Sequence, residues 1–227
     1  MAIAMIDPGH GGNSMVGGSS PNNAVGPDGV LEKDLTLDLA RRVRRALTGA
    51  GVDARLTREV DKNIGLKARA DIAREAGADA FVSLHFNGFN GVAQGTETWR
   101  HREASGDSKA LAMLVQTAVR KATGLADRGV KESGFAVLRP DHHLASTAAC
   151  LLEVSFMDVP AEEALLKTDA YKDRIALALA GAIKGWLVAD GRIPAPELFA
   201  TLAASRTEQL DAESQDGFEA EHVAVHA

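Results

Sequence analysis

The feature that most constrains the fold is a regular alternation of short apolar runs with longer amphipathic segments over the first 190 residues. Short apolar runs bounded by glycine or polar residues are typical of buried strands. They predict strands at residues 2–6, 52–56, 80–84 and 149–154. The alternating segment 94–100 (QGTETWR) predicts an exposed edge strand, and residues 136–138 are a further strand candidate.

Helices are predicted where apolar residues recur every three or four positions. This spacing indicates helices at residues 32–50, 66–76, 108–123 and 173–188. Gly51, Gly77 and Gly124 follow the first three, and glycine commonly ends a helix because it adopts the left-handed conformation. Strands that alternate with helices predict an α/β fold with a mostly parallel sheet covered by helices.

Charge divides the chain into two parts. The net charge is −6, and residues 195–227 contain seven acidic residues and only one basic residue, Arg206, so the preceding body is electrically balanced. We expect a catalytic body at residues 1–193 and an acidic tail at residues 194–227 that is partly helical or disordered.

Composition excludes several classes of protein. A balanced body without a basic stripe, with 4% aromatic residues, argues against nucleic-acid binding. No apolar run approaches the ~20 residues of a membrane helix. The single cysteine, Cys150, excludes an internal disulfide. The start, MAIAMIDPGHGG, lacks the basic residues and long apolar stretch of a secretory signal, so none is expected.

Three polar residues interrupt or follow predicted strands. His10 follows the first strand in IDPGHGG, His85 ends the strand in FVSLHFNG, and Glu153 lies within the apolar segment ACLLEVSF. Parallel strands bring their carboxyl ends to one edge of a sheet, where α/β proteins bind ligands. Glu32 begins the first helix after the long loop 11–30 and is expected near the same edge.

Two imidazoles and a carboxylate are a typical catalytic zinc set, which leaves a fourth position for water. A second carboxylate can then act as general base, and Glu32 and Glu153 are available for the two roles. Each residue also has a structural interpretation. A lone histidine is more often a hydrogen-bonded structural residue, and Glu32 can simply complement its helix N-terminus. A structural Glu153 would need a cationic partner. GHGG lacks the lysine and spacing of a P-loop.

The ordered motifs IDPGHGG, LEKD, LTREVD, LKARADIAREAGADAFVSLHFNG, DRGVKESGFAVLR and LLEVSFM cover about residues 2–188. Together they resemble the catalytic domain of zinc-dependent N-acetylmuramoyl-L-alanine amidases, which cleave peptidoglycan between the lactyl group of muramic acid and L-alanine. The resemblance implies a twisted, mostly parallel sheet of about six strands flanked by helices on both faces, as in carboxypeptidase-like enzymes. It also implies one Zn²⁺ per chain bound by His10, Glu32 and His85, with Glu153 as the catalytic carboxylate.

Two stretches depart from the family pattern and affect local loop shape rather than the implied ligands. STAACLLEV lacks the usual proline before the catalytic strand, and SFMDVP carries Asp158 where an asparagine-containing stretch is common. Some relatives insert a long helix that plugs the zinc site until a partner removes it. Residues 139–150 are too few for such a helix, so we expect an open site, a monomer and no activator protein.

The expected substrate is peptidoglycan, and the expected place of action is the cell wall, in the periplasm or outside the cell. Without an export signal the chain would accumulate in the cytoplasm until release, as an endolysin does. The alternatives are a zinc peptidase or amidohydrolase acting on another amide, and an inactive wall-binding relative.

Other polar residues receive less specific expectations. Asp7 either orients His10 or is an ordinary turn residue. Asn87 is expected to hold a loop, with a contact to the substrate peptide as the alternative, and a set of charged residues in the family-like stretches is expected to form a structural network. The charged residues are Arg58, Asp61 and Arg69. His142 and His143 precede the catalytic strand, and one of them could approach the substrate, but the sequence leaves their role open.

Overall fold

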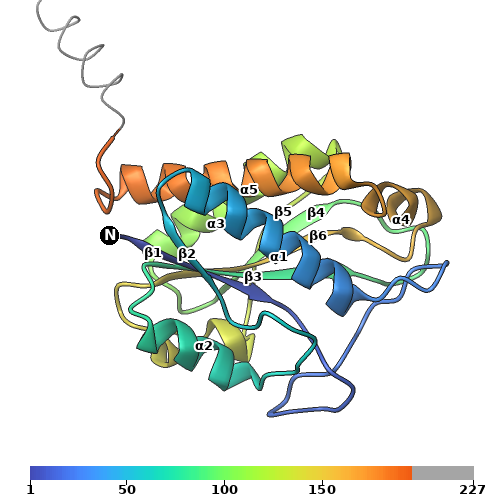
Figure 1. The fold of residues 1–227 in the computed structure, drawn as a ribbon, viewed down its shortest axis with the longest axis horizontal. Helices are drawn as coiled ribbons and strands as arrows, with labels where there is room; N and C mark the ends of the chain where they lie inside the picture. Colours follow the sequence, from blue (N-terminus) through green and yellow to red (C-terminus); the bar gives the residue numbers. More distant parts are fainter. Residues whose placement is uncertain (196–227) are drawn as a thin grey trace, which may run out of the picture. The chain divides into compact units, whose positions relative to one another are not determined.

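A six-stranded sheet forms the centre of the computed structural model, which describes residues 1–195 (Figure 1). The strand order is β2-β1-β3-β6-β4-β5. The strands are β1 (Ile3–Pro8), β2 (Asp53–Leu56), β3 (Ala80–Asn87), β4 (Thr96–His101), β5 (Asp127–Ser133) and β6 (Ala148–Phe156). All neighbouring pairs are parallel except β4 and β6, which are antiparallel. The predicted α/β fold with a mostly parallel sheet is confirmed.

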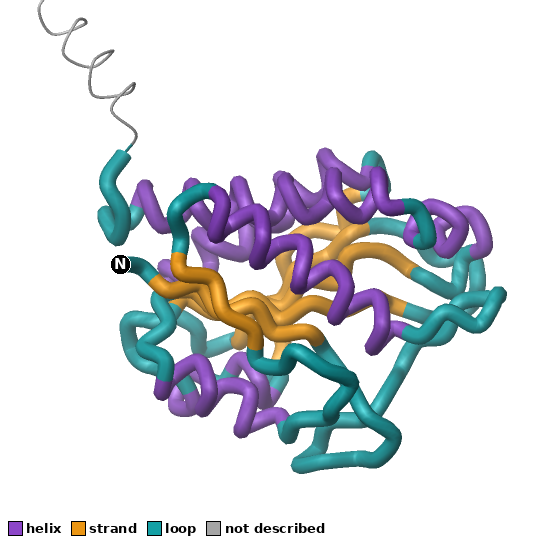
Figure 2. Tube along the Cα trace, in the orientation of Figure 1, coloured by secondary structure: helices purple, strands orange, loops and turns teal. Residues whose placement is uncertain are grey.

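Helices cover both faces of the sheet (Figures 1 and 2). One face carries α1 (Glu32–Gly49), α3 (Gly106–Thr123) and α5 (Asp169–Ala189), and α5 packs against the other two. The opposite face carries α2 (Leu66–Glu75) and the short 3-10 helices η1 (Ala136–Leu138) and η2 (Pro140–His142). Another short helix, α4 (Pro160–Leu166), follows β6. Met5, Ala73, Phe81, Leu138 and Leu151 belong to the apolar core between α2 and the sheet.

The four predicted helices and four predicted buried strands are present, with bounds that differ by a few residues. Segment 94–100 does form a strand, but the edge assignment is wrong because β4 lies between β6 and β5. Its hydroxyl residues point toward α3, where Thr96 contacts Thr123 and Thr98 donates to Gln116. These hydrogen bonds allow polar side chains in an interior strand.

Residues 136–138 form η1 rather than the predicted strand. β5 and α4 were not predicted from the sequence. β5 has the sequence DRGVKES, which contains one large apolar residue, Val130. It forms one edge of the sheet and pairs on one side only, so it needs little apolar burial.

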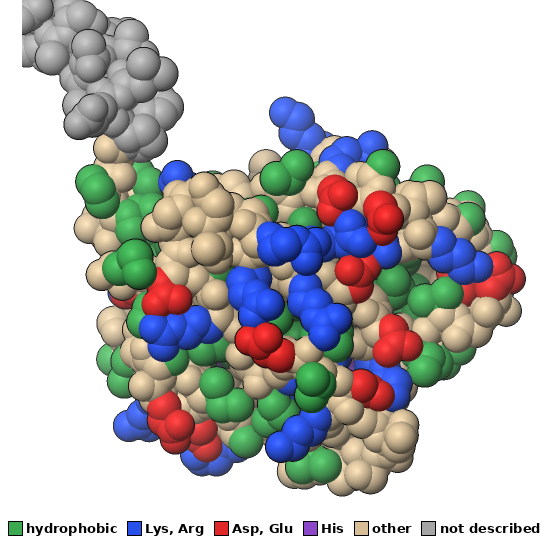
Figure 3. Space-filling view, viewed as in Figure 1, with side chains coloured by type: hydrophobic (Ala, Val, Ile, Leu, Met, Phe, Trp, Pro, Cys, Tyr) green, Lys and Arg blue, Asp and Glu red, His purple; other side chains and the backbone are tan. Residues whose placement is uncertain are grey.

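Charges of both signs are interspersed on the face that carries α1 and α5 (Figure 3). Arg42 of α1, for example, contacts Asp38 in the same helix and both Asp169 and Asp173 of α5. None of the helices among residues 1–195 is long and apolar enough to cross a membrane. Residues 1–192 form one compact unit. Apart from its first two residues, the predicted acidic tail lies outside the described residues.

A buried ion pair fixes the end of β1. Asp7 is fully buried and accepts hydrogen bonds from Arg69 (2.8 Å), Thr57 (2.5 Å) and Ser83 (2.7 Å). Burial alone would raise the pKa of the Asp7 carboxyl, but Arg69 and the two hydroxyl groups hold it below its ordinary value. Arg69, which is 1% exposed, also donates to the carbonyl groups of Pro8 and His10. The expectation that Arg69 is structural agrees with these contacts.

Replacing Arg69 with methionine should lower the free energy of unfolding by about 3–5 kcal/mol, because the substitution leaves the Asp7 carboxylate buried without a cation. Urea denaturation measures the change. The matched control is Arg74→Met on the exposed side of the same helix, which should change stability by less than ~0.5 kcal/mol. Similar losses in both variants would contradict a structural role of the buried pair.

Candidate active site

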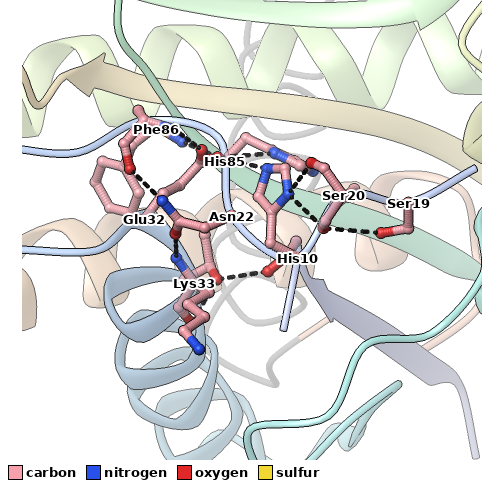
Figure 4. A network of polar contacts seen from close by, with 12 residues as sticks. His10, Ser19, Ser20, Asn22, Glu32, Lys33, His85 and Phe86 are labelled. Atoms are coloured by element: carbon pink, nitrogen blue, oxygen red, sulfur yellow. Dashed lines mark hydrogen bonds and ion pairs between the residues drawn. The ribbon is translucent and has the colours of Figure 1, made fainter. Parts of the chain in front are cut away.

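The carboxyl ends of β1, β3 and β6 lie side by side, as predicted, and bring distant parts of the chain together. His10 lies two residues beyond the end of β1, and His85 lies in the last part of β3. Glu32 is the first residue of α1, which begins beside the same edge. Figure 4 shows the side chains of His10, Glu32 and His85 converging from these three elements.

Glu32 is at the centre of this group and is 1% exposed. Its Oε1 lies 3.1 Å from Nε2 of His10 and 3.0 Å from Nδ1 of His85. The backbone N–H of Phe86 donates to the same oxygen, and that of Ala24 donates to Oε2. Burial alone would raise the pKa of Glu32, but the two imidazoles beside it hold it far below its ordinary range. Glu32 is therefore a carboxylate at neutral pH.

The backbone around His10 is strained. His10 has φ of 59°, the only positive φ among the non-glycine residues described. Its carbonyl oxygen accepts a hydrogen bond from Arg69, and its Nδ1 lies 3.0 Å from the hydroxyl of Ser20. These contacts orient the imidazole of His10 so that its Nε2 faces Glu32. Strained backbone of this kind is common where a site must hold one side chain in place.

The backbone at Gly9 lies very close to the side chain of His85. A Cβ atom at Gly9 would overlap the imidazole ring of His85, so only glycine fits there. The rings of His10 and His85 lie edge to face, with centroids 4.8 Å apart. Both histidines line a cavity of about 120 Å³ that also contacts Ser19 and Ser20.

The donor set fits a metal ion. His10, Glu32 and His85 each offer one ligand atom, and these atoms all lie within 4.8 Å of one another. The buried Nε2 of His10 lies 3.1 Å from Oε1 of Glu32 without forming a hydrogen bond, and no other described residue bonds it, which is costly for a polar atom unless another group binds it. Two imidazole nitrogens and a carboxylate oxygen suit zinc and leave one coordination position open.

Glu153 lies next to this cluster on β6. It is the register partner of His85 on β3 and of Glu97 on β4. Its Oε2 is buried and has no hydrogen-bond partner within residues 1–195. Burial raises the pKa of Glu153 well above its ordinary value, and the nearby charges of Glu32 and Glu97 raise it further. The cationic partner that a structural role would require is thus absent from the described residues.

Asp7, Arg58 and Asp61 all contact the backbone or the residues that support the chain after β1. Asp7 contacts Arg69 rather than the His10 ring, so its effect on His10 runs through the backbone, and Ser20 instead contacts the imidazole. Arg58 and Asp61 hold the loop after β1: Arg58 donates to the carbonyl groups of Pro8 and Gly9, and Asp61 accepts from the N–H of Gly12.

His142 and His143 do not join the cluster. Nδ1 of His142 lies 3.0 Å from the carbonyl of Ala136, and Nε2 of His143 lies 2.9 Å from that of Val137. Both imidazoles therefore bind the backbone of η1. Asn87 has the expected structural contact, a hydrogen bond to Glu97. Glu97 was missed because it stands in an alternating segment that predicted an exposed strand, whereas it is 4% exposed.

Glu153→Gln should stabilise the metal-free protein at neutral pH by about 1–3 kcal/mol. A carboxyl group whose pKa is raised by folding retains its proton better in the folded state, so its ionisation costs stability as pH rises above about 4.5. Glutamine has no such penalty, and the advantage of the variant should grow between pH 4.5 and 7. Thermal unfolding with a chelator present measures it.

The matched control is Glu75→Gln at the exposed end of α2, which removes one surface carboxylate. A constant difference between Glu153→Gln and the parent at every pH would show that ionisation of Glu153 carries no folding cost.

Comparisons with known proteins identify the family of this chain. The sequence pattern of the family described as N-acetylmuramoyl-L-alanine amidase (Amidase_3) matches residues 4–185. The chain is 32% identical to N-acetylmuramoyl-L-alanine amidase AmiA of Salmonella typhimurium, over 80% of this chain and 74% of the relative. It is 35% identical to the endolysin of Bacillus phage SPP1, over 77% of this chain and 62% of the relative.

Among solved structures, the catalytic domain of CwlV, an N-acetylmuramoyl-L-alanine amidase from Bacillus (Paenibacillus) polymyxa var. colistinus, matches with a TM-score of 0.73 and 33% identity. The match covers 82% of this chain and 98% of that domain. The family pattern thus spans most of the sequence, and the fold agrees with that of a solved family member. On these grounds the chain belongs to the N-acetylmuramoyl-L-alanine amidase family.

Proposed function

We propose that this chain hydrolyses the amide bond between N-acetylmuramic acid and L-alanine in peptidoglycan as a zinc enzyme. His10, Glu32 and His85 hold one Zn²⁺, and Glu153 is the catalytic carboxylate. The observation that carries the proposal is the position of an unpartnered, buried carboxyl group beside a compact His-Glu-His cluster. Membership of the amidase family supports the choice of substrate.

Zinc bound to such a set polarises a carbonyl group and lowers the pKa of water to ~7. The protein supplies the remaining chemistry. Glu153 accepts the proton of the attacking water and donates it to the nitrogen of L-alanine as the amide bond breaks. Glu32 remains ionised because backbone N–H groups and both histidines stabilise its charge, so the two carboxyl groups have different roles.

The proposal extends to the protein's partners and place of action. Residues 1–193 are the catalytic domain, and its substrate is the muramyl peptide of the cell wall, reached in the periplasm, outside the cell or as an endolysin. Residues 139–147 contain the 3-10 helix η2 and no α-helix long enough to plug the site. We infer from this that the domain needs no activator protein, and we propose separately that it acts as a monomer.

Purified protein should digest peptidoglycan without any added protein, and it should release new amino groups on alanine without new reducing sugar ends. Removal of zinc with a chelator should abolish activity, and about one equivalent of Zn²⁺ should restore it. Metal analysis and product analysis measure these outcomes. Cleavage of a different amide would favour another amidohydrolase, and absence of both metal and turnover would favour a wall-binding relative.

Substitutions should separate the metal site from the catalytic carboxylate. Glu153→Gln should retain near-stoichiometric zinc and lose activity by a factor of at least ~10², since the proton acceptor is removed. His85→Ala should lose both zinc and activity. Glu132→Gln, at an exposed position on β5, serves as the control and should retain both. Digestion of sacculi by Glu153→Gln at the parental rate would show that another group moves the proton.

A further inference from the structure

A second buried carboxylate lies directly beyond Glu153 across the sheet. Glu97 of β4 is the register partner of Glu153 of β6, and Glu153 is in turn the partner of His85 on β3. Register partners on adjacent strands point to the same face, with Cα atoms about 4.5–5.5 Å apart. The metal-binding group, the catalytic carboxyl group and Glu97 therefore follow one another in a line across the sheet.

Glu97 receives four side-chain donors from three strands. Lys131 and Arg128 of the β5 segment each lie 2.6 Å from Oε2. Asn87 and Trp99 each donate to Oε1 at 3.2 Å. Burial alone would raise the pKa of Glu97, but Lys131 and Arg128 hold it below its ordinary value. Glu97 is therefore an anion that fixes the two cations beside the catalytic centre.

The two positive charges of Arg128 and Lys131 are only partly neutralised by the single negative charge of Glu97. One carboxylate balances two positive side chains, so the cluster of Glu97, Arg128 and Lys131 carries one surplus positive charge. The side chains of Arg128 and Lys131 are 37% and 32% exposed, whereas that of Glu97 is 6% exposed. Within residues 1–195, Nη2 of Arg128 has no hydrogen-bond acceptor, and Lys131 uses one of its three donors on Glu97.

An aromatic wall limits where the ammonium group of Lys131 can point. Its Nζ lies 5.1 Å from the centre of the Trp99 ring, and Phe135 packs edge-on against Trp99 at 5.4 Å. Phe135 remains 38% exposed. On this face of the sheet α2 covers the strands near β1, and the short helix η1 contacts β6. The cations are thus oriented at a solvent-accessible surface.

The proposed function indicates the direction in which the stem peptide crosses this surface. Glu153 donates its proton to the amine of L-alanine, so the peptide leaves from the Glu153 side of the scissile bond, while the lactyl carbonyl lies toward His10 and His85. One residue of extended peptide spans about 3.3–3.6 Å, so the first residues after L-alanine reach the strands β4 and β5. The stem peptide thereby passes over Glu97 and its cations.

We propose that Arg128 and Lys131, held in place by Glu97, bind a carboxylate of the stem peptide close to the scissile amide, and that they select acidic stems over amidated ones. This inference rests on the proposed function, because that function sets the direction of the peptide. Arg128 and Lys131 bind substrate directly, and Glu97 is a positioning residue.

The test measures binding of free stem peptides by calorimetry, which requires no turnover. Two synthetic peptides that begin with L-alanine are compared, one with a free carboxylate on the next residue and one with a carboxamide there. The parent protein should bind the carboxylate form about tenfold more tightly, and Lys131→Met should remove this preference. Lys131→Arg should retain it. Lys109→Met, an exposed lysine on the α3 side of the same strands, is the control and should behave as the parent.

With muramyl peptide substrates, Lys131→Met should raise KM for the carboxylate form with little change in kcat. Equal binding of the two peptides by the parent would overturn the inference, as would equal weakening of both by Lys131→Met, which indicates a structural role. A preference for the carboxylate peptide in a protein that does not hydrolyse the amide would refute the proposed function and leave this subsite standing. Hydrolysis of the amide without any preference between the two peptides would support the proposed function and refute the carboxylate subsite.

Discussion

The site depends first on the contacts that hold the chain immediately after β1. The chain leaves the sheet after Pro8, and the carbonyl groups of residues 8–10 would lose their hydrogen bonds if they were buried without donors. Arg58 and Arg69 donate to the carbonyls of Pro8, Gly9 and His10, and Asp7 balances Arg69. Burial and the charge of Arg69 lower the pKa of Arg58 to about 10. Two buried guanidinium groups are costly, and their role here is to hold His10 in its left-handed conformation.

Three buried carboxyl groups in neighbouring elements differ because their partners differ. Glu32 has backbone donors and two imidazoles, and Glu97 has a lysine and an arginine, so the pKa of each is lowered. Glu153 lies between them without a donor, and burial together with their negative charges raises its pKa. Environments of this kind separate the pKa values of neighbouring acids, as the proposed mechanism requires of Glu32 and Glu153.

The sequence predicted the elements whose apolar pattern is set by burial. The buried strands and long helices were predicted because Val82, Leu84, Leu39 and Val43 must be shielded from water wherever they lie. It could not predict β5, whose polar residues satisfy an edge strand, nor the interior position of β4, where threonines are paired with α3. Strand order depends on pairings between distant segments, and the local pattern does not contain them.

The difference between local pattern and distant contacts also explains which residues of the candidate site could be predicted from the sequence. His10, His85 and Glu153 are conspicuous in sequence because each interrupts or ends an apolar strand, and parallel pairing is enough to bring strand ends together. Ser20 and Glu97 give no such signal, because their roles arise from contacts with residues far away in the chain. Within residues 1–195, Nε2 of His10 makes no hydrogen bond and Oε2 of Glu153 has no partner, and both conditions lower the stability of the folded domain. The proposed function accounts for both groups: the imidazole would bind a cation, and the carboxylate would carry the proton from water to the leaving amine.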